Sequence, residues 1–80
     1  MRVRLLAFAR LGELLGAQRE LEMADGACVA DAWQQLASSE PSLVALHAST
    51  RFARNGELCD ADARLHDGDE LALLPPTGGG

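Results

Sequence analysis

The sequence predicts a small α+β domain in which one main helix packs across a mixed β-sheet. Three patterns predict it: an apolar segment near each end of the chain that is typical of an internal strand, a strongly amphipathic helix between them, and an Asn-Gly pair typical of a β-hairpin. The chain has 80 residues, which is enough for one domain.

The first elements follow from alternation and helical spacing. Residues 2–9 predict a strand, because apolar and polar side chains partly alternate over a short run, and both faces are apolar enough for an internal position. Residues 11–15 have helical spacing and precede Gly16, which predicts a short helix with a glycine cap. Residues 18–23 alternate again and predict a half-exposed strand, antiparallel to the first.

The clearest helix begins near Val29 and ends before Pro41. Its apolar residues recur with the period of a helix: Val29, Ala32, Trp33, Leu36 and Ala37. Asp31 stands in the first turn, where the helix dipole favours an acid. Trp33 is expected to anchor the helix to the sheet, and Pro41 to open a second short helix.

The second half predicts a hairpin and a final strand. Asn55 and Gly56 suit a type I′ turn between residues 51–54 and 57–59. Residues 70–74 are apolar on both faces, which predicts an internal strand that Pro75 ends. The right-handed crossover rule places this last strand parallel to the first. The result is the β-grasp, or ubiquitin-like, arrangement.

The chain ends in an unusual segment: Pro75, Pro76, Thr77, Gly78, Gly79 and Gly80. Proline fixes the exit direction because its ring locks φ, and glycine without a Cβ can pass through a narrow channel. We expect residues 1–76 to form the domain and residues 77–80 a flexible tail. Its terminal carboxylate, on Gly80, would enter the active site of another protein; a terminus that is merely mobile is the alternative.

Composition limits the classes of partner. The net charge is −5, which argues against nucleic acid and anionic membranes and suits a basic docking face or simply a solvated surface. No apolar run is long enough for a signal peptide or a membrane span, so a cytoplasmic location is expected. Cys28, Cys59, His47 and His66 have no metal-ligand spacing, so no metal is assigned, and both cysteines are expected to be small buried residues.

The chain contains no lysine. A protein whose carboxyl end is activated is thereby protected from attack by its own ε-amines. Arginine bias from a GC-rich genome explains the same composition and is the favoured interpretation at this stage.

Two motifs resemble the small subunits of molybdopterin synthase, of the MoaD type. Residues 8–16 resemble the run F-A-x-x-x-E-L-x-G, and Asn55 with residues 65–71 and 75–80 resembles the closing pattern N…L-x-D-G-D-E and P-P-x-x-G-G. The resemblance spans the whole chain, although residues 24–49 match only in pattern. Gly78 departs from the family pattern by making a triple glycine.

The resemblance implies a sulfur carrier with no catalysis of its own and no bound cofactor. An E1-like activating enzyme would use ATP to adenylate the carboxylate of Gly80, and a sulfur donor would convert it to a thiocarboxylate. The large subunit, in a heterotetramer, would receive the tail, and the sulfur would pass to cyclic pyranopterin monophosphate in molybdenum cofactor biosynthesis. By position, Phe8, Leu58 and Leu74 would form an apolar surface that docks the large subunit, unless Phe8 and Leu74 belong to the core.

Two other classes stay open. A sulfur carrier of the thiamine pathway, of tRNA thiolation or of cysteine synthesis would share the fold and the Gly-Gly end. A ubiquitin-like modifier or a pure interaction module would share the fold without sulfur transfer.

Overall fold

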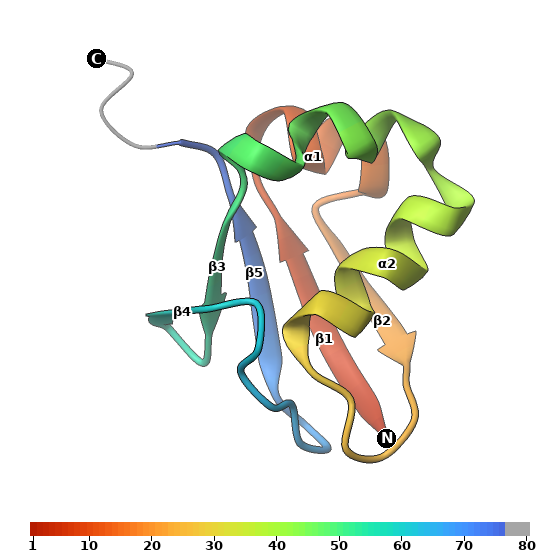
Figure 1. Ribbon diagram of the computed structural model, residues 1–80, viewed down its shortest axis with the longest axis vertical. Helices are drawn as coiled ribbons and strands as arrows, with labels where there is room; N and C mark the ends of the chain where they lie inside the picture. Colours follow the sequence, from red (N-terminus) through yellow and green to blue (C-terminus); the bar gives the residue numbers. More distant parts are fainter. Residues whose placement is uncertain (77–80) are drawn as a thin grey trace.

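The computed structural model describes residues 1–76 and confirms the predicted order of elements (Figure 1). That order is β1 (Arg2–Ala7), α1 (Ala9–Leu15), β2 (Gln18–Glu22), α2 (Val29–Ser39), the 3₁₀ helix η1 (Pro41–Ser49), β3 (Arg51–Arg54), β4 (Glu57–Cys59) and β5 (Glu70–Leu74). The α+β class and the β-grasp arrangement predicted from the sequence are both present.

All five strands form one mixed sheet in the order β2-β1-β5-β3-β4. β1 and β5 run parallel, and each of the other three pairs runs antiparallel. β1 and β5 therefore both have a neighbour on each side, as their two apolar faces predicted. Their register pairs Arg4 with Glu70 and Ala7 with Leu73, so the first and last strands of the chain lie side by side (Figure 1).

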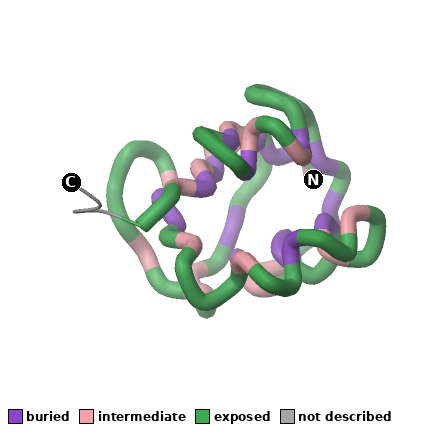
Figure 2. The backbone as a smooth tube through the Cα atoms, turned by 90° about the horizontal axis from the view of Figure 1, so that it is seen from above, coloured by how far each residue is buried: buried purple, intermediate pink, exposed green. Residues whose placement is uncertain are grey.

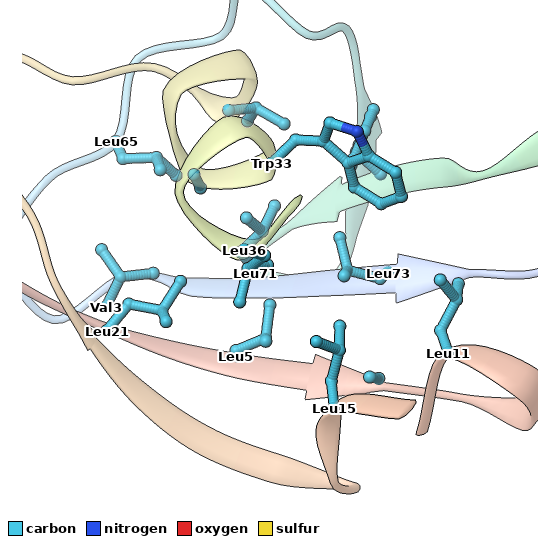
Figure 3. Close-up of a cluster of buried hydrophobic side chains, with 14 of the residues drawn as sticks. Val3, Leu5, Leu11, Leu15, Leu21, Trp33, Leu36, Leu65, Leu71 and Leu73 are labelled. Atoms are coloured by element: carbon cyan, nitrogen blue, oxygen red, sulfur yellow. The ribbon is translucent and has the colours of Figure 1, made fainter. Parts of the chain in front are cut away.

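The hydrophobic core fills the space between α2 and one face of the sheet. Side chains from α2, β1 and β5 meet there (Figure 3). Trp33 is 6% exposed, and its ring meets Phe52 edge-on at 5.9 Å and His47 at 5.3 Å, which confirms it as the anchor of the helix. Short buried stretches alternate with exposed loops along the chain (Figure 2).

The capping and turn signals act as predicted. Asp31 accepts a hydrogen bond from the Cys28 backbone N–H at 2.9 Å, which completes a capping box at the start of α2. Asn55 and Gly56 have φ of 51° and 86°, the two positive values that a type I′ turn requires. Pro41 opens η1 as expected, and Leu43 of η1 is fully buried.

The first strand is shorter than predicted. It ends at Ala7, because the Phe8 carbonyl already accepts hydrogen bonds from the N–H groups of Leu11 and Gly12, at 3.1 and 3.3 Å. Ala9 has φ of 54°, a left-handed conformation that turns the chain sharply from β1 into α1. The expectation that residues 2–9 form one strand is therefore wrong for its last two residues. Phe8 is the N-cap of α1, and Ala9 is the first residue of that helix.

We predict that Gly12→Ala destabilises the fold. An added Cβ would lie 2.8 Å from the Ala7 carbonyl oxygen, a backbone atom of β1 that cannot rotate away. Overpacking of this kind costs about 1–3 kcal/mol, more than alanine gains over glycine inside a helix. Urea denaturation would measure the loss, with the exposed neighbour substitution Glu13→Ala as the control. A Gly12→Ala protein as stable as the wild type would contradict the prediction.

Candidate functional site

The end of the domain is held firmly up to Leu74. β5 lies between β1 and β3, with Leu73 opposite Ala7 and Leu74 opposite Arg51. The Phe8 N–H donates to the Leu73 carbonyl at 3.3 Å and extends this pairing by one residue beyond β1. The chain therefore leaves the sheet at a defined point, and the exposed Pro75 and Pro76 continue from there (Figure 1).

A small hollow of about 60 Å³ lies beside this exit point. It is formed by the start of α1, the end of η1 and the two prolines, and its lining residues are Phe8, Ala9, Arg10, Leu11, Leu46, Ser49, Thr50, Pro75 and Pro76. The sharp turn at Ala9 brings α1 next to the exit point. Two helices and the last strand thus surround the place where the chain continues into the tail.

The sheet face opposite α2 carries an apolar strip, which we call the open-face patch. It comprises Leu6, Ala53, Leu58, Ala72 and Leu74. The register pairs Leu6 with Ala72, Ala72 with Ala53, and Ala53 with Leu58, so these four side chains form one row across four strands. Leu74 is on the same face of β5, two residues beyond Ala72.

Burial shows that no element of residues 1–76 covers this patch completely. Leu58 is 65% exposed, and Leu6, Ala72 and Leu74 are half-buried. Ala53 is 7% exposed but stands apart from the core cluster. An exposed apolar strip of this kind on a small domain marks a binding surface.

Two of the three predicted interface residues, Leu58 and Leu74, belong to this patch, and the third, Phe8, lines the hollow beside the tail exit. Phe8 is 46% exposed directly after β1, and Leu74 is half-buried and outside the core cluster, so neither is an ordinary core residue. Leu58 lies two strands away, on the edge strand β4. Ala53 and Ala72 join it to Leu74. Sequence reasoning missed these two alanines, although alternation along β5 would have found Ala72.

Thr77, Gly78, Gly79 and Gly80 lie outside the described residues. Their predicted roles as the threading segment and the reactive terminus stay predictions. Pro75 and Pro76, the described part of the predicted threading segment, point the chain away from the sheet beside Phe8.

Charged residues border the open-face patch on both sides, as a single arginine at the tail exit and as a row of three at the other end. Arg51 pairs with Leu74 at the exit of the tail. Arg4 pairs with Glu70 and Glu20 at the other end of the sheet. A partner of this face would therefore need an apolar centre and a charged rim, the usual anatomy of a protein–protein interface.

Hydrogen bonds of Asn55 and Asp69 fix the N-terminal end of β5, opposite the tail exit. Asn55 donates through Nδ2 to Asp69 Oδ1 at 3.0 Å and accepts through Oδ1 from the Glu70 N–H at 2.9 Å. Asp69 Oδ2 accepts from the His66 N–H at 2.8 Å. Burial opposes ionisation of Asp69, but the hydrogen bonds from Asn55 and His66 outweigh it and lower the pKa of this carboxyl.

Residues 1–76 contain no cluster of three or more His, Cys, Asp or Glu side chains that could hold a metal ion. The expectation of two buried cysteines is wrong, because both are half-exposed and Cys28 caps α2. Burial of its side chain raises the pKa of the Cys59 thiol, which keeps it protonated near neutral pH. His47 packs on Trp33, and His66 lies 3.7 Å from Asp69.

Comparison with known proteins matches nearly the whole chain. The family model described as "ThiS family" matches residues 5–80. The molybdopterin synthase sulfur carrier subunit of Chlamydomonas reinhardtii is 36% identical over 84 aligned residues, which cover all of both chains.

Solved structures give the same picture. SAMP1 from Haloferax volcanii is 30% identical, with a TM-score of 0.84 and full coverage of both chains. The putative molybdopterin converting factor, subunit 1, from Pyrococcus furiosus is 27% identical, with a TM-score of 0.85, and the match covers 95% of this chain and 98% of that one. A chain of the BexX/CysO complex from Amycolatopsis orientalis is 26% identical, with a TM-score of 0.70 and coverage of 98% and 99%.

We predict that Asp69→Asn destabilises the protein at pH 7 and much less at pH 3. An amide has one acceptor oxygen in place of two, so one of the bonds from Asn55 and His66 is lost, at a cost of about 1–2 kcal/mol. The pKa of Asp69 is lowered by folding, so its stabilising effect is complete above the unfolded value of about 4 and disappears as the pH falls through the folded value.

Urea unfolding of both proteins at the two pH values would measure this difference. The exposed Asp62→Asn serves as the control and should leave the unfolding midpoint nearly unchanged. An Asp69→Asn deficit of the same size at pH 3 and pH 7 would contradict the assignment.

Proposed function

The chain belongs to the ThiS family, and from this premise we propose that it is the sulfur carrier subunit of a molybdopterin synthase. The sulfur is carried as a thiocarboxylate on Gly80. The full-length match to a sulfur carrier subunit supports the assignment, and so do the D-G-D-E turn and the P-P-x-x-G-G ending. The carrier works as a donor in an assembly and does not catalyse a reaction alone.

One structural observation carries the mechanism: the internal strand β5 delivers the chain end to the border of an exposed apolar patch. A partner that covers the open-face patch receives the tail in a known direction, because Leu73 is paired on both sides, Leu74 is paired with Arg51, and the two prolines restrict the backbone after them. The four residues after Pro76 span at most about 14 Å when extended, enough to reach a recessed active site.

The chemistry assigns a simple role to the carrier. A carboxylate is a poor electrophile, so the activating enzyme joins the Gly80 carboxylate oxygen to the α-phosphorus of ATP, and pyrophosphate leaves. A sulfur nucleophile then attacks the acyl carbon, and AMP leaves with the oxygen. The thiocarboxylate sulfur is the nucleophile of the last step, in which it attacks cyclic pyranopterin monophosphate. Water then cleaves the bond between the acyl carbon and the sulfur, which leaves the sulfur on the pterin and restores the Gly80 carboxylate. The general acids, general bases and phosphate-binding groups that these reactions require belong to the partner proteins.

We assign the open-face patch and Phe8 to the docking of the large subunit. A central apolar strip with a charged rim fits a stable heteromeric contact. We extend the proposal to a heterotetramer of two carriers and two large subunits, which the resemblance to the family implies. The same face is available to the E1-like activating enzyme, so the two partners would bind in turn. A cytoplasmic location accords with these partners. None of the helices in residues 1–76 has the length and hydrophobicity that crossing a membrane requires.

A second candidate function is protein modification. Its support is the 30% identity to SAMP1, since a related structure, also from Haloferax volcanii, is named small archaeal modifier protein 1. A modifier would pass its activated terminus to a lysine of a target, forming an amide. In a carrier, a sulfur nucleophile attacks the activated terminus, and the terminus returns to the free acid after the sulfur has been transferred. The two functions therefore differ in the nucleophile that attacks the acyl carbon of Gly80.

The carrier assignment predicts a defined mass change at the terminus. Incubation with an activating enzyme, ATP and a sulfur donor should raise the intact mass by the difference between sulfur and oxygen, and the pterin precursor with the large subunit should reverse it. Deletion of Gly80 should abolish both changes and leave the unfolding midpoint unaltered, because the tail follows the last strand. Full sulfur transfer without Gly80 would refute the carrier model.

The docking assignment predicts that Leu58→Asp weakens binding of the large subunit far more than it weakens folding. Leu58 is 65% exposed, so the free domain tolerates the charge, whereas an apolar contact would have to bury it unpaired. We expect at least a tenfold rise in Kd by calorimetry, equivalent to about 1.4 kcal/mol, and a smaller rise for Phe8→Ala. Val44→Asp, an equally exposed site on η1, is the control. Unchanged affinity for Leu58→Asp would rule out this surface.

A further inference from the structure

The two basic side chains next to the tail exit are both arginines. Arg10 lines the same hollow as Pro75 and Pro76, and Arg51 is paired with Leu74 at the end of β5. All seven basic residues of the 80-residue chain are arginines. The exit of the tail is therefore basic, on a chain with a net charge of −5, without a single ε-amine.

This choice matters for an activated carboxyl group. A lysine amine has a pKa of about 10.4, so a fraction of it is unprotonated near neutral pH and attacks acyl carbons. A guanidinium stays protonated at all physiological pH values and has no free electron pair on nitrogen to donate. Arginine and lysine thus give the same charge at this site but opposite reactivity toward an acyl-adenylate or a thioester.

The α-amine of Met1 is kept from the tail in two ways. It donates to the Met23 carbonyl at 2.7 Å and lies 3.5 Å from Asp25, so its position is fixed beside β2 and the turn after it. It also lies at the other end of the sheet from Pro76 (Figure 1). The pairing of Arg4 with Glu70 puts nine strand residues, about 30 Å, between Met1 and Pro76, twice the reach of a four-residue tail.

Resting on the proposed function, we propose that Arg10 and Arg51 are specificity-determining residues that stop the carrier from acylating itself. They keep the tail exit cationic and offer the activated acyl carbon of Gly80 no amine within reach. The activated end can then pass only to a nucleophile of another molecule. Compositional bias alone explains the missing lysines, but it does not explain why the Met1 amine is also held by Met23 and Asp25.

The side reaction that these residues prevent would end the carrier cycle. A lysine nitrogen would attack the acyl carbon, the bond from that carbon to the leaving group would break, and the proton of the amine would pass to solvent. The product is an amide that closes the tail onto the body. Sulfur nucleophiles cannot reopen an amide, so each such event would remove one carrier from use.

Geometry identifies position 10 as the place where a lysine would do most harm. Pro76 and residue 10 line the same hollow, so a lysine side chain at position 10 would lie within about 14 Å of Pro76, the maximum span of four residues. Position 2 lies on β1. By the β1–β5 register it is level with residue 68, so eight strand residues, about 26 Å, separate it from Pro76. Arg10 and Arg2 are both about two-thirds exposed and both pair with a glutamate, so Arg2→Lys is a matched control for Arg10→Lys.

The experiment uses the full chain with Gly80 prepared as a thioester by intein cleavage, in the absence of any partner enzyme. The wild type should convert only to the free acid, by hydrolysis. Arg10→Lys should convert mainly to a product lighter than the free acid by one water, the mass of the closed amide, and peptide mapping should place the new bond at residue 10. Arg2→Lys should behave as the wild type.

Three outcomes would overturn the proposal: amide formation in the wild type, hydrolysis alone in Arg10→Lys, or equal closure in Arg2→Lys. If Arg10→Lys fails to fold by circular dichroism, Arg51→Lys takes its place with the same expected product. The thioester needs no activating enzyme, so this test can fail while sulfur loading by the partners succeeds, and the reverse also holds.

Discussion

The parallel pairing of β1 with β5 is the contact on which the rest of the structure depends. It joins the first and last strands of the chain and puts both in the middle of the sheet. The pairing aligns Leu6 with Ala72, which begins the apolar row of the open face. It also brings the Phe8 N–H to the Leu73 carbonyl, so that the backbone is held until one residue before the exit. Without this pairing the chain end would leave from an edge, next to no binding surface.

The two faces of the sheet have different tasks. The face under α2 is packed with leucine, valine and the Trp33 ring, and it supplies the stability of the domain. The opposite face has the open-face patch between Arg51 at the tail exit and the charged row of Glu20, Arg4 and Glu70. The core under α2 supplies the stability of the domain, so the opposite face can leave an apolar strip exposed. That strip is then available to bind a partner.

Most motif residues that mark the family act on the structure and not on the chemistry. Gly16 ends α1 with a φ of 89°, and Asn55 and Asp69 bind the start of β5 to the hairpin. One group therefore shapes the exit end of the sheet, and the other fixes the opposite end of the strand that leads to it. These motif residues hold β5 in register. The contribution of the domain to the chemistry is then to direct the chain end, with the acyl carbon of Gly80, toward the partner.

The sequence by itself determined the fold class, the order of the elements and the internal positions of the first and last strands, because periodicity, capping and turn chemistry act over a few residues. It also contained the D-G-D-E turn and the P-P-x-x-G-G motif of residues 75–80, which together support the carrier proposal. Only the tertiary structure decided that Phe8 belongs to the turn into α1, that Ala53 and Ala72 link Leu58 to Leu74, and that Arg10 stands beside Pro76. These facts depend on strand register and on contacts between distant segments. Local patterns carry no record of them, since a shift of one residue in the pairing would send every side chain to the other face.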